Sequence, residues 1–235
     1  MLDTVAALGH GRGTEARGPS MRLVAHEFMT LDGVMQGPGG AEEDTAGGFR
    51  WGGWVAPAFD ETVSSVVTGW FERTDELLFG RTTYDMMAAY WPLVTDPADP
   101  VAQRLNTAPK HVVSTTLRLE DAPWERTASV IAADVPQRIR DLKALGHGEL
   151  QVHGSWQLLQ TLLDEGLLDE LRLIVFPVVV GRGKRLFDDV QRPSGFEVAD
   201  ARVAPSGAVA MTLTPAPFRT ATYEVVDGKE VMVEE

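Results

Sequence analysis

Residues 149–187 constrain the fold more than any other stretch of this chain. A short apolar run around Leu150 and Val152 stops at Gly154 and Ser155, and leucines then recur at the spacing of an amphipathic helix. Gly166 follows the last turn of that pattern, where glycine commonly ends a helix. A second apolar run, residues 171–180, is rich in β-branched side chains, which favour strands. The stretch therefore predicts a strand, a turn, a helix and a second strand.

The turn at Gly154 and Ser155 has two interpretations. The first N–H groups of a helix have no partner within the helix and carry a partial positive charge, so they attract phosphate. Gly154 would let the backbone approach such a ligand, and Ser155 would cap the helix or donate its hydroxyl. The alternative is a tight turn with an N-cap and no ligand. This stretch alone leaves both open.

Composition limits the classes of function. The chain has 21 Lys and Arg against 34 Asp and Glu, so its net charge of −13 argues against general nucleic-acid binding. No apolar run is long enough to span a bilayer. The absence of Cys and the spacing of the five His argue against a metal site. We expect a cytoplasmic protein whose partner is a small molecule, with no nucleic acid and no membrane.

The order of patterns along the chain predicts the fold class. Residues 1–20 contain four glycines and no apolar periodicity, so we expect a disordered N-terminal extension before a single domain at residues 21–235. Strands alternate with helices from Met21 onward, and residues 195–204, 209–213 and 221–226 then read as further strands. This order predicts an α/β protein, a three-layer α/β/α domain with a central mixed, mostly parallel sheet.

Two further strands end in residues that suit phosphate: Gly80, Arg81 and Thr82 after residues 76–79, and Ser114 and Thr115 after residues 110–113. An arginine guanidinium offers a planar fork of donors to phosphate. Taken singly, these residues are equally well a surface arginine and turn-capping hydroxyls. Ligands of open α/β sheets gather at the carboxyl ends of strands, however, so the three strand ends together predict one groove for a dinucleotide.

Two other stretches carry weaker signals. Residues 36–53 form a glycine-rich loop whose aromatic cluster, Phe49, Trp51 and Trp54, is either a lid over an apolar ligand or a satellite core. Residues 181–184 resemble a phosphate-binding loop, but Val178 and Arg185 occupy positions that require Gly and Ser or Thr. No G-x-G-x-x-G fingerprint opens a strand–helix unit.

Four ordered segments resemble the dihydrofolate reductase-like superfamily: TLDGV at 30–34, LLFGRTTYDMMAAYWP at 77–92, KHVVSTTL at 110–117, and residues 150–187. They are most similar to the branch that contains the C-terminal reductase domain of the bifunctional riboflavin-pathway deaminase–reductase. The resemblance covers nearly everything from Met21 to Val226. It implies a mixed sheet flanked by helices, NADPH as hydride donor, and a homodimer.

The resemblance also implies roles for individual residues. Arg81 with Ser114 or Thr115 would hold the adenosine 2′-phosphate. Thr82 and the backbone at Gly154, Ser155 and Trp156 would receive the pyrophosphate, with Gly80 in the same cofactor-binding set and Leu158 beside the nicotinamide half. Asp32 would lie near the reaction centre, with Asp60 as a second catalytic candidate. The substrate is expected at Leu31, Trp54 and Tyr84.

The sequence departs from true dihydrofolate reductases, which carry a carboxylate on the first long helix. Here the nearest acids are Asp60 and Glu61, at the start of that helix, and Ser64 stands near the expected position. No deaminase-type zinc motif precedes the domain, so we expect a stand-alone reductase. The sequence predicts an NADPH-dependent oxidoreductase that transfers a hydride to a small heterocyclic or ribosylamino-pyrimidine substrate, similar to 5-amino-6-(5-phosphoribosylamino)uracil reductase. A dihydrofolate reductase and a catalytically silent nucleotide-binding protein are the alternatives.

Overall fold

The computed structural model describes residues 20–188 and 192–234. The disordered extension predicted at residues 1–20 lies, apart from Ser20, outside these residues. None of the helices in the described ranges is long and apolar enough to cross a membrane.

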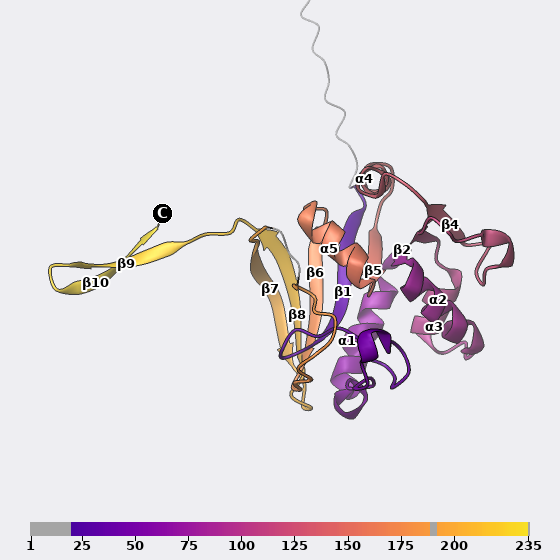
Figure 1. Ribbon diagram of the computed structural model, residues 1–235, viewed down its shortest axis with the longest axis horizontal. Coiled ribbons are helices and arrows are strands. Elements are labelled where there is room, and N and C mark those ends of the chain that lie inside the picture. The colour runs from indigo at the N-terminus through magenta and orange to yellow at the C-terminus, as the bar shows by residue number, and fades with distance from the viewer. Residues whose placement is uncertain (1–19, 189–191, 235) are drawn as a thin grey trace, which may run out of the picture.

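The body of the molecule is built on one mixed sheet of eight strands, in the order β4-β3-β2-β5-β1-β6-β8-β7 (Figure 1). β8 runs antiparallel to both β6 and β7, and the other neighbouring pairs are parallel. The predicted mixed, mostly parallel sheet is therefore confirmed. Its strands are β1 (Arg22–Thr30), β2 (Thr74–Gly80), β3 (Lys110–Val113), β4 (Ala128–Ile131), β5 (Glu149–His153), β6 (Glu170–Phe176), β7 (Gly195–Val203) and β8 (Val209–Ala216).

Helices cover both faces of this sheet, because side chains along a strand alternate between its faces. In β2, Leu77 and Phe79 pack with residues of α1 (Glu61–Glu72), α2 (Arg81–Tyr90) and α3 (Pro100–Thr107). Leu78, which points to the opposite face, packs with residues of α4 (Val135–Leu145) and α5 (Trp156–Asp164). These three residues have no exposed surface, and each such burial contributes about 1.5–3 kcal/mol. The predicted three layers are confirmed.

Some element boundaries differ from those that the sequence predicts. The apolar run of residues 171–180 is a strand only as far as Phe176, because Pro177 has no N–H to continue the ladder. The long helix α1 begins at Glu61, and Pro57 lies before it in a separate short turn at Ala56–Ala58.

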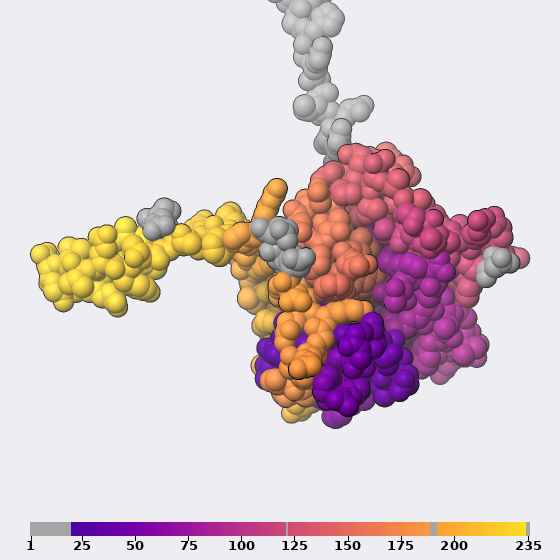
Figure 2. Space-filling model, in the orientation of Figure 1, coloured from indigo at the N-terminus to yellow at the C-terminus, as the bar shows by residue number. Residues whose placement is uncertain are grey.

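A hairpin at the C-terminal end projects from the body (Figures 1 and 2). The strand predicted at residues 221–226 is β9 (Ala221–Val226), and it pairs antiparallel with β10 (Lys229–Glu234), which the sequence interpretation missed. The two strands form a sheet of their own, outside the eight-stranded one. The region predicted as one domain thus carries an arm that makes no contribution to the main sheet.

Candidate functional site

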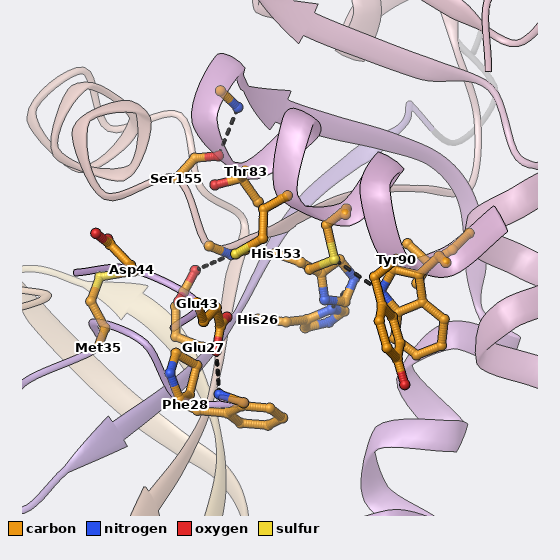
Figure 3. A pocket seen from close by; sticks show the side chains of 18 of the residues that line it. His26, Glu27, Phe28, Met35, Glu43, Asp44, Thr83, Tyr90, His153 and Ser155 are labelled. Atoms are coloured by element: carbon orange, nitrogen blue, oxygen red, sulfur yellow. Dashed lines mark hydrogen bonds between the residues drawn. The ribbon is translucent and has the colours of Figure 1, made fainter. Parts of the chain in front are cut away.

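A cavity of about 1950 Å³ lies at the carboxyl ends of the parallel strands (Figure 3). Its walls include the end of β2 at Gly80, the end of β5 at His153, and residues 26–28 of β1. Loop residues 35–40 and 42–44 and Lys184 add a further wall. The strand ends predicted to form one groove are therefore brought together around β2 and β5.

Apart from α3, whose first residue Pro100 also lines the cavity, three helices present their first residues to it: α2 at Arg81, α4 at Val135 and α5 at Trp156. None of the three has a side chain that caps its first N–H groups. By contrast, Asp60 caps α1 and Asp99 caps α3 through side-chain oxygens. The uncapped N–H groups and the partial positive charge of the three helices make this wall suited to an anion.

Ser155 connects two of these helix starts. Its Oγ accepts a 2.7 Å hydrogen bond from the Gly80 N–H, so it holds the end of β2 and does not cap α5. A Cβ on Gly80 would approach the Ser155 Cβ to 3.2 Å, and Gly154 has a φ of +69°, which favours glycine. Gly80 is therefore favoured by the close approach of the two strand ends, and Gly154 by its left-handed backbone conformation.

Arg81 stands at the mouth of the cavity on α2. Its Nε donates to both carboxylate oxygens of Asp85, at 2.9 and 2.7 Å, and its Nη1 lies 3.4 Å from Thr116 Oγ1. Ser114 Oγ accepts from the N–H groups of Thr116 and Leu117, so this hydroxyl caps a turn. Ser114 and Thr115 do not line the cavity, whereas the other predicted cofactor residues do: Gly80, Arg81, Thr82, Gly154, Ser155, Trp156 and Leu158.

Glu27 is a buried carboxyl group in the wall of the cavity, with 4% of its surface exposed. Its Oε1 accepts a 2.8 Å hydrogen bond from the Gly154 N–H (Figure 3). Burial raises the pKa of Glu27 well above its usual range, and this one hydrogen bond offsets the shift only in part. The cavity therefore holds a carboxyl that favours its protonated form.

The two predicted catalytic acids lie outside the cavity lining. Asp32 accepts from the Thr30 hydroxyl and from the N–H groups of Val180 and Gly181, and so fixes one loop against another. Asp60 accepts from the N–H groups of Val63 and Ser206, as the N-cap of α1. Both carboxylates are engaged by backbone donors, and the geometry gives neither a place beside a ligand in this cavity.

The predicted substrate residues are not among the lining residues either. Trp54 is buried in a core cluster with Phe49, and its indole N–H donates to Gln36 O. Tyr84 is buried in a second cluster and donates to Pro123 O. Leu31 is 64% exposed. Of the two interpretations of the aromatic loop, the core cluster is correct for Phe49 and Trp54.

Sequence reasoning missed Glu27 and His26 as cavity residues. The signal that could have found them is a pair of ionisable residues in the middle of an otherwise apolar strand. His153 lies at the end of β5, directly before Gly154. It is 8% exposed and lines the cavity.

The cavity lies at the carboxyl ends of the strands of a sheet covered on both faces, which is where α/β proteins of this architecture bind their ligands. The RibD C-terminal domain family matches residues 22–210, and the chain therefore belongs to that family. The match ends before the β9–β10 hairpin.

One curated protein and several solved structures are similar to this chain over most of its length. The uncharacterized protein YyaP of Bacillus subtilis is 27% identical over 194 residues, which cover 80% of this chain and 92% of YyaP. A pyrimidine reductase-like protein from Corynebacterium diphtheriae has a similar structure, with a TM-score of 0.58 and 13% identity over 84% of this chain and 93% of that one. The diaminohydroxyphosphoribosylaminopyrimidine deaminase/5-amino-6-(5-phosphoribosylamino)uracil reductase of Thermotoga maritima has a TM-score of 0.56 and 15% identity. The match covers 84% of this chain and 57% of that protein. At these identities the two structures support the fold.

Proposed function

We propose that this protein is an NADPH-dependent reductase whose substrate is a small heterocycle of the ribosylamino-pyrimidine type. The observation that carries the proposal is the convergence of three uncapped helix starts, on α2, α4 and α5, on one cavity with Arg81 at its mouth. The RibD C-terminal domain family and the pyrimidine reductase-like neighbour support the same class of reaction.

The donors of the cavity fit a phosphate-rich cofactor. The chain has a net charge of −13, so an anion must be held by local donors and not by the overall field. The N–H groups at the starts of α2 and α5 would bind the pyrophosphate, and the Arg81 guanidinium would bind the 2′-phosphate by exchanging part of its pairing with Asp85. NADPH, when bound, supplies the hydride.

Reduction of a C=O or C=N bond also requires a proton. Burial raises the pKa of two carboxyls that line the cavity, Glu27 and Glu43. Glu27 is the more deeply buried of the two, so it can hold a proton and deliver it to the substrate oxygen or nitrogen. The Gly154 N–H would then stabilise the carboxylate that is left. Asp32, whose hydrogen bonds lower its pKa despite some burial, is not suited to this role.

The test is calorimetric titration of the protein with NADPH and with NADH. A charge-assisted contact to the 2′-phosphate contributes about 1.5–3 kcal/mol, so NADPH should bind about 10- to 100-fold more tightly than NADH. Arg81→Ala should abolish this preference. Arg138→Ala is the matched control, because Arg138 also lies on a helix in a surface ion pair, with Asp141, but does not line the cavity.

Two results would contradict the proposal. Failure of both nucleotides to bind would rule out the cofactor. An equal loss of NADPH affinity in Arg81→Ala and Arg138→Ala would rule out the 2′-phosphate site. NADPH binding without oxidation of NADPH by any ribosylamino-pyrimidine would instead support the catalytically silent nucleotide-binding protein. Dihydrofolate is offered as a second hydride acceptor, so that the dihydrofolate reductase alternative is compared in the same assay.

A further inference from the structure

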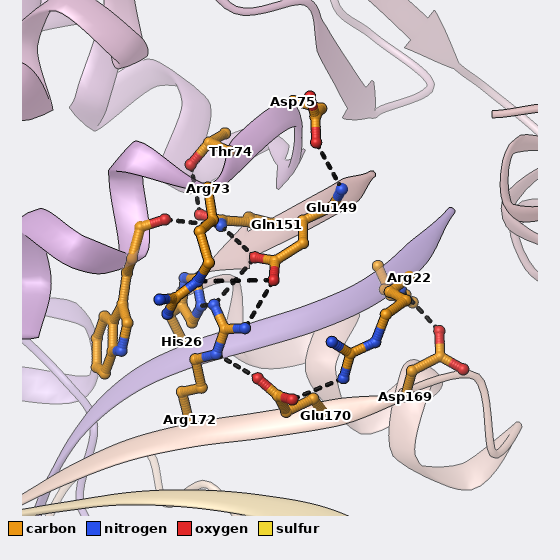
Figure 4. Close-up of polar contacts among 12 residues, drawn as sticks. Arg22, His26, Arg73, Thr74, Asp75, Glu149, Gln151, Asp169, Glu170 and Arg172 are labelled. Atoms are coloured by element: carbon orange, nitrogen blue, oxygen red, sulfur yellow. Dashed lines mark hydrogen bonds and ion pairs between the residues drawn. The ribbon is translucent and has the colours of Figure 1, made fainter. Parts of the chain in front are cut away.

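A buried polar network joins residues of β1, β5 and β6 (Figure 4). Through His26 it reaches His153, which lines the cavity. At the centre of the network is Arg172 of β6, whose side chain is 5% exposed. Its Nη1 and Nη2 donate to Glu149 at 3.0 and 2.7 Å, and its Nε donates to Glu170. Two carboxylates thus fix the position of the guanidinium.

Arg172 determines which nitrogen of His26 carries the proton. Arg172 Nη1 lies 3.0 Å from His26 Nε2, and because a guanidinium only donates, His26 Nε2 must accept. The proton of the neutral His26 ring is therefore on Nδ1. That nitrogen lies 3.2 Å from His153 Nε2, which must accept in turn, so the proton of His153 is on Nδ1.

Gln151 Oε1 competes for the same nitrogen, at 3.1 Å from His153 Nε2. The Thr74 hydroxyl already donates to this oxygen at 2.6 Å. A proton on His153 Nε2 would also point at the proton on His26 Nδ1. The arrangement therefore favours the Nδ1–H form of His153, with Gln151 satisfied by Thr74.

The rings of both histidines are held in place by stacking. His26 lies on Trp70 with ring centroids 4.6 Å apart, and His153 lies on Phe71 at 4.4 Å. His153 Nε2 lies beside His26 and Gln151, whereas Nδ1 has no hydrogen-bond partner in the described part of the chain. Since His153 lines the cavity, Nδ1 is the ring nitrogen available to a ligand there.

Both rings are held in the neutral form. Burial and, secondarily, the charge of Arg172 lower the pKa of His153 to about 3. Burial, His153 and Arg172 also lower the pKa of His26 well below its usual range. A neutral ring with its proton on Nδ1 can donate to a ligand from that nitrogen.

We propose that His153 donates a hydrogen bond from Nδ1 to an acceptor atom of the substrate, and that Arg172 is the positioning residue that fixes this proton through His26. The inference rests on the proposed function, since it places the heterocycle against His153. The geometry selects a carbonyl oxygen or an unprotonated ring nitrogen at this point of the substrate, and disfavours an amino group.

The relay is tested on the free protein by long-range ¹H–¹⁵N correlation spectra of ¹⁵N-histidine-labelled samples at pH 7, with His153 assigned from His153→Asn. We expect His153 in the Nδ1–H form. In His26→Phe, which keeps a ring on Trp70 but removes the donor to His153, the proton should move to Nε2 and pair with Gln151. Arg172→Lys keeps a positive charge between Glu149 and Glu170, and it should also abolish the preference of His153 for the Nδ1–H form. An Nε2–H form in the unaltered protein, or no change in His26→Phe, would overturn the relay.

The ligand contact is tested with 5,6-diaminouracil as the probe, added to the protein with NADPH present. The Nδ1–H signal of His153 should shift, and the affinity for the probe should fall about tenfold in His153→Gln, whose amide reaches toward the Nε2 position. His153→Asn, whose amide lies near the Nδ1 position, should retain most of the affinity. An unshifted Nδ1–H signal would overturn the contact with substrate. The proposed contact of His153 is with the substrate and not with the cofactor. Calorimetric NADPH binding therefore reports on the proposed function separately, and failure here is distinguishable from failure of the proposed function.

Discussion

Glu27 and Asp32 are two carboxyl groups at the same end of the first strand, and they are held in opposite ways. Glu27 is buried beside the cavity and accepts one described hydrogen bond, from the Gly154 N–H. Asp32 accepts from the Thr30 hydroxyl and from the N–H groups of Val180 and Gly181. The pKa of Glu27 is raised by burial, whereas for Asp32 burial is outweighed by these donors and the pKa is lowered.

The difference shows what decides the protonation of a carboxyl group. Removal from water disfavours the charged form of both side chains, and the number of donors aimed at each then sets the balance. Asp32 belongs to the TLDGV segment, for which the sequence predicts a place near the reaction centre. Its hydrogen-bond donors, however, stabilise its charged form and fix one loop against another. Glu27 belongs to no motif, and with a single described donor it favours its protonated form.

The largest effect is expected for Asp32→Ala. This substitution leaves the N–H groups of Val180 and Gly181 and the Thr30 hydroxyl without their acceptor. Hydrogen bonds to charged groups contribute about 1.5–3 kcal/mol each and are not additive, so the free energy of unfolding should fall by about 3 kcal/mol in urea titrations. Asp32→Asn, which keeps one acceptor oxygen, should lose less.

NADPH affinity of the folded Asp32→Ala protein should stay within about twofold of the unaltered protein, since Asp32 does not line the cavity. If Asp32→Ala abolished NADPH binding without lowering the stability of the protein, Asp32 would belong near the reaction centre. The comparison of Asp32 with Glu27 would then be reversed.

The next effect concerns Glu27→Gln and depends on pH. Because the folded-state pKa of Glu27 is raised, its contribution to stability is greatest below the ordinary pKa of 4.5 and is lost as pH rises through the folded-state value. Over that window the unaltered protein should lose about 1.4 kcal/mol per pH unit relative to Glu27→Gln. Gln keeps an oxygen for the Gly154 N–H, so the two proteins should be nearly equal near pH 4.

Urea unfolding at pH 4, 5, 6 and 7 measures this difference. Glu61→Gln, at an exposed position of α1, controls for the removal of one carboxylate. Parallel stability curves for the unaltered protein and Glu27→Gln would mean that Glu27 ionises as an ordinary glutamate, and the contrast with Asp32 would disappear.

Local pattern was enough to predict the parts of the site that form within one strand–helix unit. Gly80 with Arg81 and Gly154 with Ser155 stand where a strand passes directly into a helix, and both junctions line the cavity as predicted. The class of sheet, mixed and mostly parallel, could be predicted because alternating strands and helices leave few possible arrangements. Glycine and helical periodicity carry this information without knowledge of distant partners.

What the sequence did not predict depends on partners that are far away along the chain. The donors of Asp32 at Val180 and Gly181 lie 148 and 149 residues away, and the Gly154 N–H lies 127 residues from Glu27. The same holds for Trp54 and Tyr84, whose aromatic rings suit a ligand pocket as well as a core until their neighbours are known. Protonation and burial are properties of these distant contacts, and residue type alone does not determine them.

The smallest effect, and the sharpest test of the comparison, is expected for Thr30→Val. Thr30 is fully buried, its Oγ1 donates to Asp32 Oδ1 at 2.7 Å, and the same oxygen accepts from the Val34 N–H at 2.9 Å. Valine has nearly the same shape but no hydroxyl, so the free energy of unfolding should fall by about 1–2 kcal/mol. The pKa of Asp32, followed by ¹³C NMR of its carboxyl group, should move up toward the ordinary range while that of Glu27 stays unchanged. Thr30→Ser retains the hydroxyl and should leave both pKa values in place. If Thr30→Val leaves the Asp32 pKa where it is, the charge is held by the backbone N–H groups of Val180 and Gly181 together with Arg185, 3.7 Å away. The number of hydrogen-bond donors would then no longer explain why the two carboxyls differ.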